Sequence, residues 1–240
     1  MKRFVVGDIH GRFHALKEVL KISKFNYKKD KLVVLGDVAD GGYNTYEVVE
    51  ELLKINNLIY IIGNHDEFFL NHIKSGWAEE IWIQQGGGNT LRSYGASVKE
   101  ARRVTDNSLL DTRGLKIPVT HQHFFNTGYY YYVEDNMVFV HGGFIPGIPL
   151  DKQKKVDLVW DRELIRFAKD NPIPEFDKVF VGHTTTQTIS DFSHIKPTVP
   201  LKYNNLWCMD TGAGWNGKLS IMNIDTEKYW QSKPQEPAIR

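Results

Sequence analysis

The stretch that decides the fold is Phe4-Val5-Val6-Gly7-Asp8-Ile9-His10-Gly11, or FVVGDIHG in one-letter code. It opens with consecutive apolar residues, mostly β-branched, which is typical of a short strand buried on both faces. A glycine ends the strand, and Asp8 and His10 follow at once. A carboxylate and an imidazole directly after a buried strand are candidate metal ligands.

The same construction recurs along the chain. A short apolar run meets a glycine or a histidine, and polar side chains come next, at 32–37 (LVVLGD), 58–66 (LIYIIGNHD), 137–143 (MVFVHGG) and 179–184 (VFVGHT). Open α/β sheets bind ligands beyond the carboxyl ends of their strands. We therefore expect these strand ends to bring their Asp, Asn and His side chains to one site.

Helical patterns separate the first strands. Apolar residues recur at helical spacing over 14–24, and a second helix is predicted to begin at a cap formed by Asn44 or Thr45. The alternation of strand and helix over 4–62 predicts a βαβαβ unit with parallel strands. A third helix, capped by Asp161, is expected to end before Pro172. Strands over 206–209 and 219–224 are expected to form a hairpin through Asn216-Gly217.

The segment 67–125 has a different character, with apolar residues at helical spacing and a run of glycines at 86–88. It predicts a helical insertion that lies over the site. We interpret Trp77, Trp82 and the tyrosines at 129–132 as packing residues, the tyrosines within a strand-prone stretch. One domain over 1–230 holds this insertion, and residues 231–240, rich in polar residues and proline, are predicted to be a frayed tail.

Composition narrows the function. Lys and Arg number 30 against 29 Asp and Glu, so the formal net charge of +1 argues against a nucleic-acid partner and a polybasic membrane anchor. No stretch approaches the ~20 apolar residues that span a bilayer, and the single cysteine, Cys208, cannot form an intrachain disulfide. We expect a cytoplasmic protein. Nine histidines beside one cysteine indicate metal binding through nitrogen and oxygen.

The strand-end residues form a plausible dinuclear ligand set. Asp8 and His10 are two residues apart just past a strand, where alternate side chains point the same way, and the two oxygens of Asp37 can bridge two ions. Manganese, iron and zinc all suit such ligands. Two ions ~3.5–4 Å apart can clamp a phosphate and activate a water. The candidate metal ligands are Asp8, His10, Asp37, Asn64, His141 and His183.

These motifs together resemble a known family. GDIHG at 7–11, GDVADG at 36–41, GNHD at 63–66, HGG at 141–143 and GHT at 182–184 are similar to the phosphoprotein phosphatase branch of the calcineurin-like metallophosphoesterases. Within it, the chain looks most like bacterial and phage serine/threonine phosphatases and symmetrical diadenosine tetraphosphate hydrolases. Further matches are QGG at 85–87, Thr90 and DTG at 210–212. The resemblance implies an α/β fold, a four-layer αββα sandwich of two mixed sheets.

The resemblance also implies roles. Asp8, His10 and Asp37 would hold one divalent ion, and Asp37, Asn64, His141 and His183 the other, with manganese expected and iron or zinc as alternatives. A metal-bridging hydroxide would attack a phosphomonoester in line. His65 would be the general acid that protonates the leaving oxygen, with Asp40 holding it protonated and oriented. Asn64 and Arg162 would bind the substrate phosphate.

One departure from the family pattern leaves the substrate open. The family's second motif ends in Asp-Arg-Gly, whereas Asp40 here is followed by Gly41 and Gly42, so one phosphate-binding guanidinium is missing. Arg92 is a candidate replacement. We expect a phosphatase acting on phosphorylated Ser/Thr of proteins or on small phosphate esters. The alternatives are a symmetrical dinucleoside polyphosphate hydrolase and a metal-binding regulator without catalysis. The sequence does not predict the oligomeric state.

Overall fold

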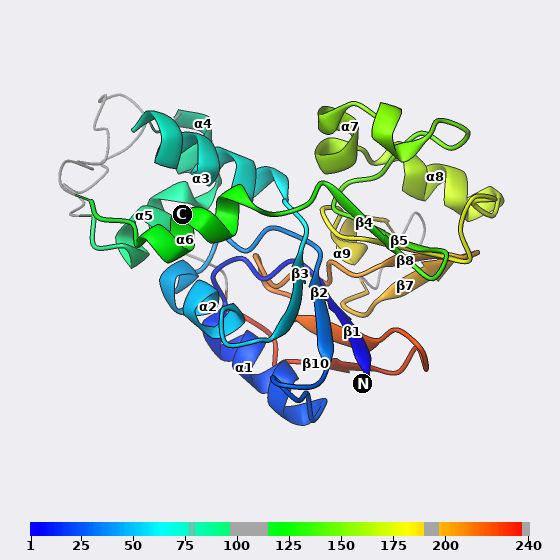
Figure 1. The fold of residues 1–240 in the computed structure, drawn as a ribbon, viewed down its shortest axis with the longest axis horizontal. Helices are drawn as coiled ribbons and strands as arrows, with labels where there is room; N and C mark the ends of the chain where they lie inside the picture. The colour runs from blue at the N-terminus through cyan, green and yellow to red at the C-terminus, as the bar shows by residue number, and fades with distance from the viewer. Residues whose placement is uncertain (77, 79, 97–114, 190–196, 237–240) are drawn as a thin grey trace.

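The strands form two sheets (Figure 1) in the computed structural model, which describes residues 1–76, 78, 80–96, 115–189 and 197–236. The first sheet has the order β10-β9-β1-β2-β3. Its strands are β1 (Arg3–Val6), β2 (Lys31–Val34), β3 (Asn57–Tyr60), β9 (Ser220–Asn223) and β10 (Tyr229–Gln231). The second has the order β4-β5-β6-β8-β7. Its strands are β4 (Tyr131–Glu134), β5 (Met137–Val140), β6 (Lys178–Val181), β7 (Leu201–Tyr203) and β8 (Leu206–Cys208).

Both sheets are mixed. β1, β2 and β3 pair in parallel, as the βαβαβ pattern predicts, and β9 and β10 add antiparallel pairs. In the second sheet β5, β6 and β8 are parallel to one another, while β4 and β7 run antiparallel to their neighbours. Each parallel strand is apolar on both faces because both faces are covered.

The side chains of β1 alternate between two apolar clusters, which shows what covers each face of the first sheet. Val5 lies in the apolar cluster between the two sheets, whereas Phe4 and Val6 lie in the cluster under α1 (Phe13–Ile22) and α2 (Thr45–Leu52). A third cluster joins the second sheet to α7 (Lys155–Trp160), α8 (Glu163–Asp170) and α9 (Thr186–Ile189). Figure 1 shows α1 and α2 beside the first sheet and α7 and α8 beside the second. This confirms the predicted four-layer αββα sandwich.

Helices connect β3 to β4. They are α3 (Asn64–Ser75), α4 (Glu80–Trp82), a π-helical turn (Ile83–Gly87), α5 (Gly88–Ser93) and α6 (Val119–Asn126). These elements overlap the segment expected to be a helical insertion, although 77, 79 and 97–114 lie outside the described residues, Trp77 among them. A short 3-10 helix (Leu150–Lys152) follows β5. No helix of the described ranges is long and apolar enough to cross a membrane.

One prediction was wrong at the C-terminal end. The strands around Asn216-Gly217 do not form a hairpin, because β8 belongs to the second sheet and β9 to the first. The Gly217 amide donates to Gly212 O at 2.8 Å. The turn therefore lies in the connection that leads from β8 in the second sheet to β9 in the first. In the described part of the expected tail, Ser232 N donates to Leu219 O at 2.9 Å and Gln235 N to Gly217 O at 2.7 Å. Residues 237–240 lie outside the described residues.

The predicted helix caps had mixed outcomes. α2 begins where expected, but the Asn44 side chain makes no capping hydrogen bond. The N-cap residue of α8 is Arg162, one residue after the predicted cap, but Asp161 Oδ2 does accept the Leu164 amide at 2.8 Å. The helix ends at Asp170, before Pro172, as predicted.

Candidate metal centre and its acid pair

The candidate metal ligands, together with Asp40 and His65, lie in loops or a helix start at the carboxyl ends of strands, whereas Arg162 lies between α7 and α8. Four of them, His10, Asp37, Asp40 and His183, have left-handed backbones with φ of 48°, 47°, 70° and 61°. Such conformations are disfavoured outside glycine and gather at functional sites. The alternation argument for Asp8 and His10 is therefore wrong, because the loop after β1 is not extended.

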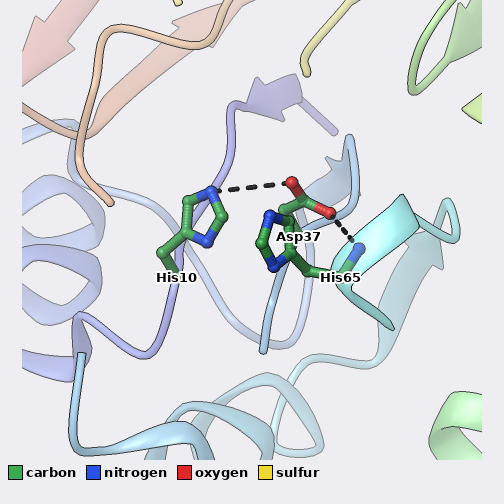
Figure 2. A group of neighbouring side chains, drawn as sticks. All are labelled: His10, Asp37 and His65. Carbon is green, nitrogen blue, oxygen red and sulfur yellow. Dashed lines mark hydrogen bonds and ion pairs between the residues drawn. The ribbon is translucent and has the colours of Figure 1, made fainter. Parts of the chain in front are cut away.

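The first group of possible ligands is His10, Asp37 and His65 (Figure 2). His10 Nδ1 lies 3.2 Å from Ala39 O and donates to it, which leaves Nε2 facing Asp37 Oδ2 at 3.5 Å. The His65 backbone amide donates to Asp37 Oδ1 at 3.0 Å. Burial lowers the pKa of His10 to about 4. His10 is thus neutral near pH 7, the form in which imidazole ligates a metal.

The second group is Asp37, His141 and His183. His141 Nδ1 donates to Leu35 O at 2.7 Å, so Nε2 faces Asp37 Oδ1 at 3.3 Å. Asn64 Oδ1 lies 3.0 Å from His141 Nε2 and 2.9 Å from His183 Nδ1. The Asp37 carboxylate therefore lies between the two groups and presents one oxygen to each.

Asp8 is outside both groups but borders the second. Its Oδ2 accepts the His183 amide at 2.9 Å. Its Oδ1 is buried, and among the described residues it has no hydrogen-bond partner; the same holds for His183 Nε2. A buried polar atom without a partner is costly. A β-carbon on Gly182 would lie 2.3 Å from Asp8 Oδ1, so only glycine leaves that oxygen its place.

Buried negative charge surrounds these groups. Asp8, Asp37, Asp66 and Asp210 are each at most 2% exposed. Burial first, then Asp210 and Asp37, raises the pKa of Asp8 well above its usual range, and burial raises that of Asp66 to about 7 and that of Asp210 to about 6. In the described part of the chain, no lysine or arginine pairs with any of the four. Divalent cations would neutralise this cluster, and the oxygen and nitrogen donors fit them.

His65 of the first group also forms a histidine–carboxylate pair. His65 Nδ1 donates to Asp40 Oδ2 at 2.7 Å, and Asp40 is fully buried. Trp82 Nε1 donates to the same oxygen at 2.8 Å, and Thr90 Oγ1 donates to Oδ1 at 2.7 Å. Burial lowers the pKa of His65, but Asp37 and Asp40 outweigh it and raise the pKa to about 9. His65 is therefore protonated at neutral pH and can act as an acid.

The two candidate arginines differ in their relation to the site. Arg162 Nη1 donates to Thr184 Oγ1 at 2.8 Å, next to His183, and its charge adds to burial and His141 in lowering the pKa of His183 to about 3. Arg92 Nη1 donates to Asn89 Oδ1 at 2.7 Å, and Asn89 Nδ2 donates to Gly41 O at 2.7 Å. Arg92 thus lies one side chain away from the position of the missing arginine.

Several site residues were missed by the sequence interpretation. Trp82 is a packing residue, as predicted, at 1% exposure, but it also binds Asp40. Asp66 accepts the amides of Val38 and Ala39 at 2.9 and 3.0 Å and that of Gly63 at 3.0 Å, which ties the loops after β2 and β3 together. Its place in the GNHD motif was the available signal. Asp210 lies in the DTG motif.

His65 of the first group is protonated near neutral pH, so it is available as an acid and not as a metal ligand. The remaining side chains of the two groups could hold metal ions around the shared Asp37 carboxylate, an arrangement suited to the hydrolysis of phosphate esters. Comparison with known proteins agrees with that class. The model of the calcineurin-like phosphoesterases matches residues 1–206, and the chain belongs to this family of metal-dependent hydrolases.

Its relatives have more than one activity. The chain is 27% identical to serine/threonine-protein phosphatase 1 of Salmonella typhimurium over 226 residues, 92% of this chain and 91% of that protein. It is 33% identical to the symmetrical bis(5'-nucleosyl)-tetraphosphatase of Coxiella burnetii over 67 residues, 28% of this chain but only 23% of that enzyme. A crystal structure provisionally described as a diadenosine tetraphosphatase has a TM-score of 0.68 at 18% identity, covering 98% of this chain and 93% of that one. At that identity the likeness concerns the fold alone.

Proposed function

We propose that this chain is a dinuclear metal-dependent phosphatase that hydrolyses phosphomonoesters, with phosphoserine and phosphothreonine of proteins as its substrates. The observation that carries the proposal is the Asp37 carboxylate, which lies between His10 at 3.5 Å and His141 at 3.3 Å with one oxygen toward each. Similarity to a protein phosphatase over 92% of this chain favours this substrate over dinucleotides, because the symmetrical tetraphosphatases of Coxiella burnetii and Nitrosomonas europaea match 28% and 63% of the chain.

Under this proposal Asp8, His10 and Asp37 hold one divalent ion, with manganese expected. Asp37, Asn64, His141 and His183 hold the other. Among the described residues Asp8 Oδ1 has no hydrogen-bond partner, which supports Asp8 as a ligand, and His183 presents Nδ1 toward Asn64 Oδ1 at 2.9 Å. When bound, two such ions supply a water of lowered pKa as the nucleophile and neutralise charge on the phosphoryl oxygens.

His65 is the proposed acid. Its Nδ1 is engaged by Asp40 at 2.7 Å, so Nε2 is the atom that gives its proton to the leaving oxygen. Asp40 fixes the tautomer and keeps the ring charged until the proton is transferred. Arg162 and Asn64 would bind phosphoryl oxygens, because a guanidinium placed beside His183 offers paired N–H donors to an oxyanion.

A substrate panel with added manganese tests the proposed function. We expect a phosphoserine peptide and 4-nitrophenyl phosphate to be hydrolysed, and diadenosine tetraphosphate to be a poor substrate by kcat/KM. Release of two ADP at a kcat/KM above that of the peptide would instead establish the dinucleotide hydrolase. Two bound ions per chain without any hydrolysis would favour a regulator.

The substitution His65→Asn tests the assigned acid. Turnover of the phosphoserine peptide should fall by about 10²–10⁴-fold, because an alkoxide leaves poorly unless it is protonated. Turnover of 4-nitrophenyl phosphate should fall far less, and the metal content should not change. Full activity of the variant on the peptide would exclude His65 as the acid.

A further inference from the structure

The carboxylate of Asp40 is held from outside its own loop. It is fully buried and receives three side-chain hydrogen bonds, and two of the donors belong to the helical segment after α3. Trp82 Nε1 donates to Oδ2 at 2.8 Å, the oxygen that also accepts His65 Nδ1 at 2.7 Å. Thr90 Oγ1 donates to Oδ1 at 2.7 Å.

The indole of Trp82 is seated in a fixed orientation. It is 1% exposed and stacks on Phe69 with ring centroids 6.1 Å apart. The glycines that follow make this approach possible: a β-carbon on Gly87 would lie 2.4 Å from the indole, and one on Gly86, whose φ is 111°, would lie 2.6 Å from Gly41 N. The run of glycines therefore brings the indole N–H to Asp40.

The Thr90 hydroxyl is held in one orientation against the other carboxylate oxygen of Asp40, Oδ1. Its Oγ1 accepts the Asp40 backbone amide at 2.7 Å, so its own proton is directed to Asp40 Oδ1. A buried carboxylate that lacks donors is strongly penalised and turns toward whatever donors remain. With one donor from the segment on each oxygen, the plane of the carboxylate is set independently of His65.

We propose that Trp82 and Thr90 are positioning residues for the acid, through which the helical segment orients His65 by way of Asp40. This inference rests on the proposed function of His65. Neither residue is proposed to contact the substrate. Their substitution should therefore slow the hydrolysis of those substrates whose leaving group needs a proton. Serine and other alkyl leaving groups need that proton, whereas 4-nitrophenolate hardly does.

The test is Trp82→Phe, which keeps a buried ring and removes the N–H. With manganese present, kcat for a phosphoserine peptide should fall by about 10-fold, the amount expected for a lost hydrogen bond to a charged group. KM for the peptide and kcat for 4-nitrophenyl phosphate should stay within about 2-fold, since neither depends on protonation of the leaving group. Thr90→Val, which removes only the hydroxyl donor, should give the same selective loss and serves if Trp82→Phe does not fold.

Trp207→Phe is the matched control. Trp207 is also buried, between the sheets, and among the described residues its Nε1 has no acceptor. Removing that N–H should leave the ratio of the two substrates unchanged. In an Asp40→Ala background, Trp82→Phe should have no further selective effect, because the acceptor is gone.

The outcomes separate this inference from the proposed function. A selective loss in His65→Asn together with unchanged selectivity in Trp82→Phe and Thr90→Val would overturn the inference and leave the acid in place. Equal loss on both substrates, or a selective loss that persists without Asp40, would also overturn it. Unchanged selectivity in His65→Asn would reject the assigned acid itself.

Discussion

At the scale of single residues, the candidate site depends on backbones that most side chains avoid. The left-handed conformations of His10, Asp37, Asp40 and His183 each cost about 1–3 kcal/mol in general and persist only when their surroundings hold them. The sequence predicted these residues because polar side chains follow apolar runs. Their backbone conformation was not predictable, because the contacts that impose it come from other loops: the Gly11 amide on Val38 O at 2.9 Å is one.

One such contact gives a residue-scale prediction. A β-carbon on Gly63 would lie 2.1 Å from Asp37 Oδ1 and 2.4 Å from Asp37 N. Gly63→Ala should therefore displace the proposed bridging carboxylate and reduce both bound metal and turnover by at least about 10-fold, the effect of a misplaced ligand or its support. Gly128→Ala is the control, since the atoms nearest to its β-carbon would be side-chain atoms of Ile62 and Tyr60. It should lower stability while metal content stays normal, and normal metal content in Gly63→Ala would contradict the prediction.

At the scale of elements, local patterns were predictable and distant pairings were not. The helices α1, α2 and α8 and the strands β1, β2, β3, β5, β6, β8 and β9 follow from patterns within each segment, whereas β7 and β10 were not predicted. The hairpin at Asn216-Gly217 failed because a turn dipeptide reports a local reversal of the chain and does not tell which sheet receives the next strand. The contact of Trp82 with Asp40 was missed for the same reason, because it joins residues 42 apart in sequence. The helical spacing of Trp82 indicates only that its ring is buried.

The packing of α1 on α2 includes a buried carboxylate that should make the stability of the protein depend on pH. Glu51 is buried, and its carboxylate accepts from Lys54 Nζ at 2.8 Å and Lys17 Nζ at 3.0 Å. Burial raises its pKa, but Lys54, Tyr27 and Lys17 outweigh burial and hold the pKa below its usual 4.5. A lowered pKa in the folded state means that this stabilisation is present above pH 4.5 and is lost as the pH falls through the folded value.

Glu51→Gln should accordingly lower the free energy of unfolding by about 2 kcal/mol at pH 7, the range for hydrogen bonds to charged groups. The difference from the parent should shrink as the pH falls below 4.5. Urea unfolding of both proteins at several pH values measures it. A difference that does not change with pH would show that the charge of Glu51 contributes nothing.

At the scale of the whole molecule, the buried carboxylates link stability to metal. Asp8, Asp37, Asp66 and Asp210 are held together by both sheets and repel one another when no cation is present. Ions that bind only the folded chain stabilise it by about 2.7 kcal/mol at a concentration 100 times the Kd. Chelation should therefore lower the Tm and abolish turnover, and manganese should restore both.

Asp37→Asn provides the control for this effect. Without the shared carboxylate, added manganese should raise the Tm much less than in the parent protein. Calorimetry on chelated and reloaded samples measures the difference. An unchanged Tm after the metal has been removed would show that the carboxylate cluster is stable without cations.

The pairing of Val6 with Ile221 inside the first sheet has a consequence for biogenesis. β1 is made early, yet one of its two neighbours, β9, leaves the ribosome some two hundred residues later. A nascent chain that ends before β9 therefore carries an unpaired strand edge beside a site whose ligand loops are already synthesised. Such edges recruit other chains, and long-range pairing slows folding. Translational pausing upstream of residue 220 should favour aggregation of this protein, and chaperone binding to the open edge of β1 would suppress it.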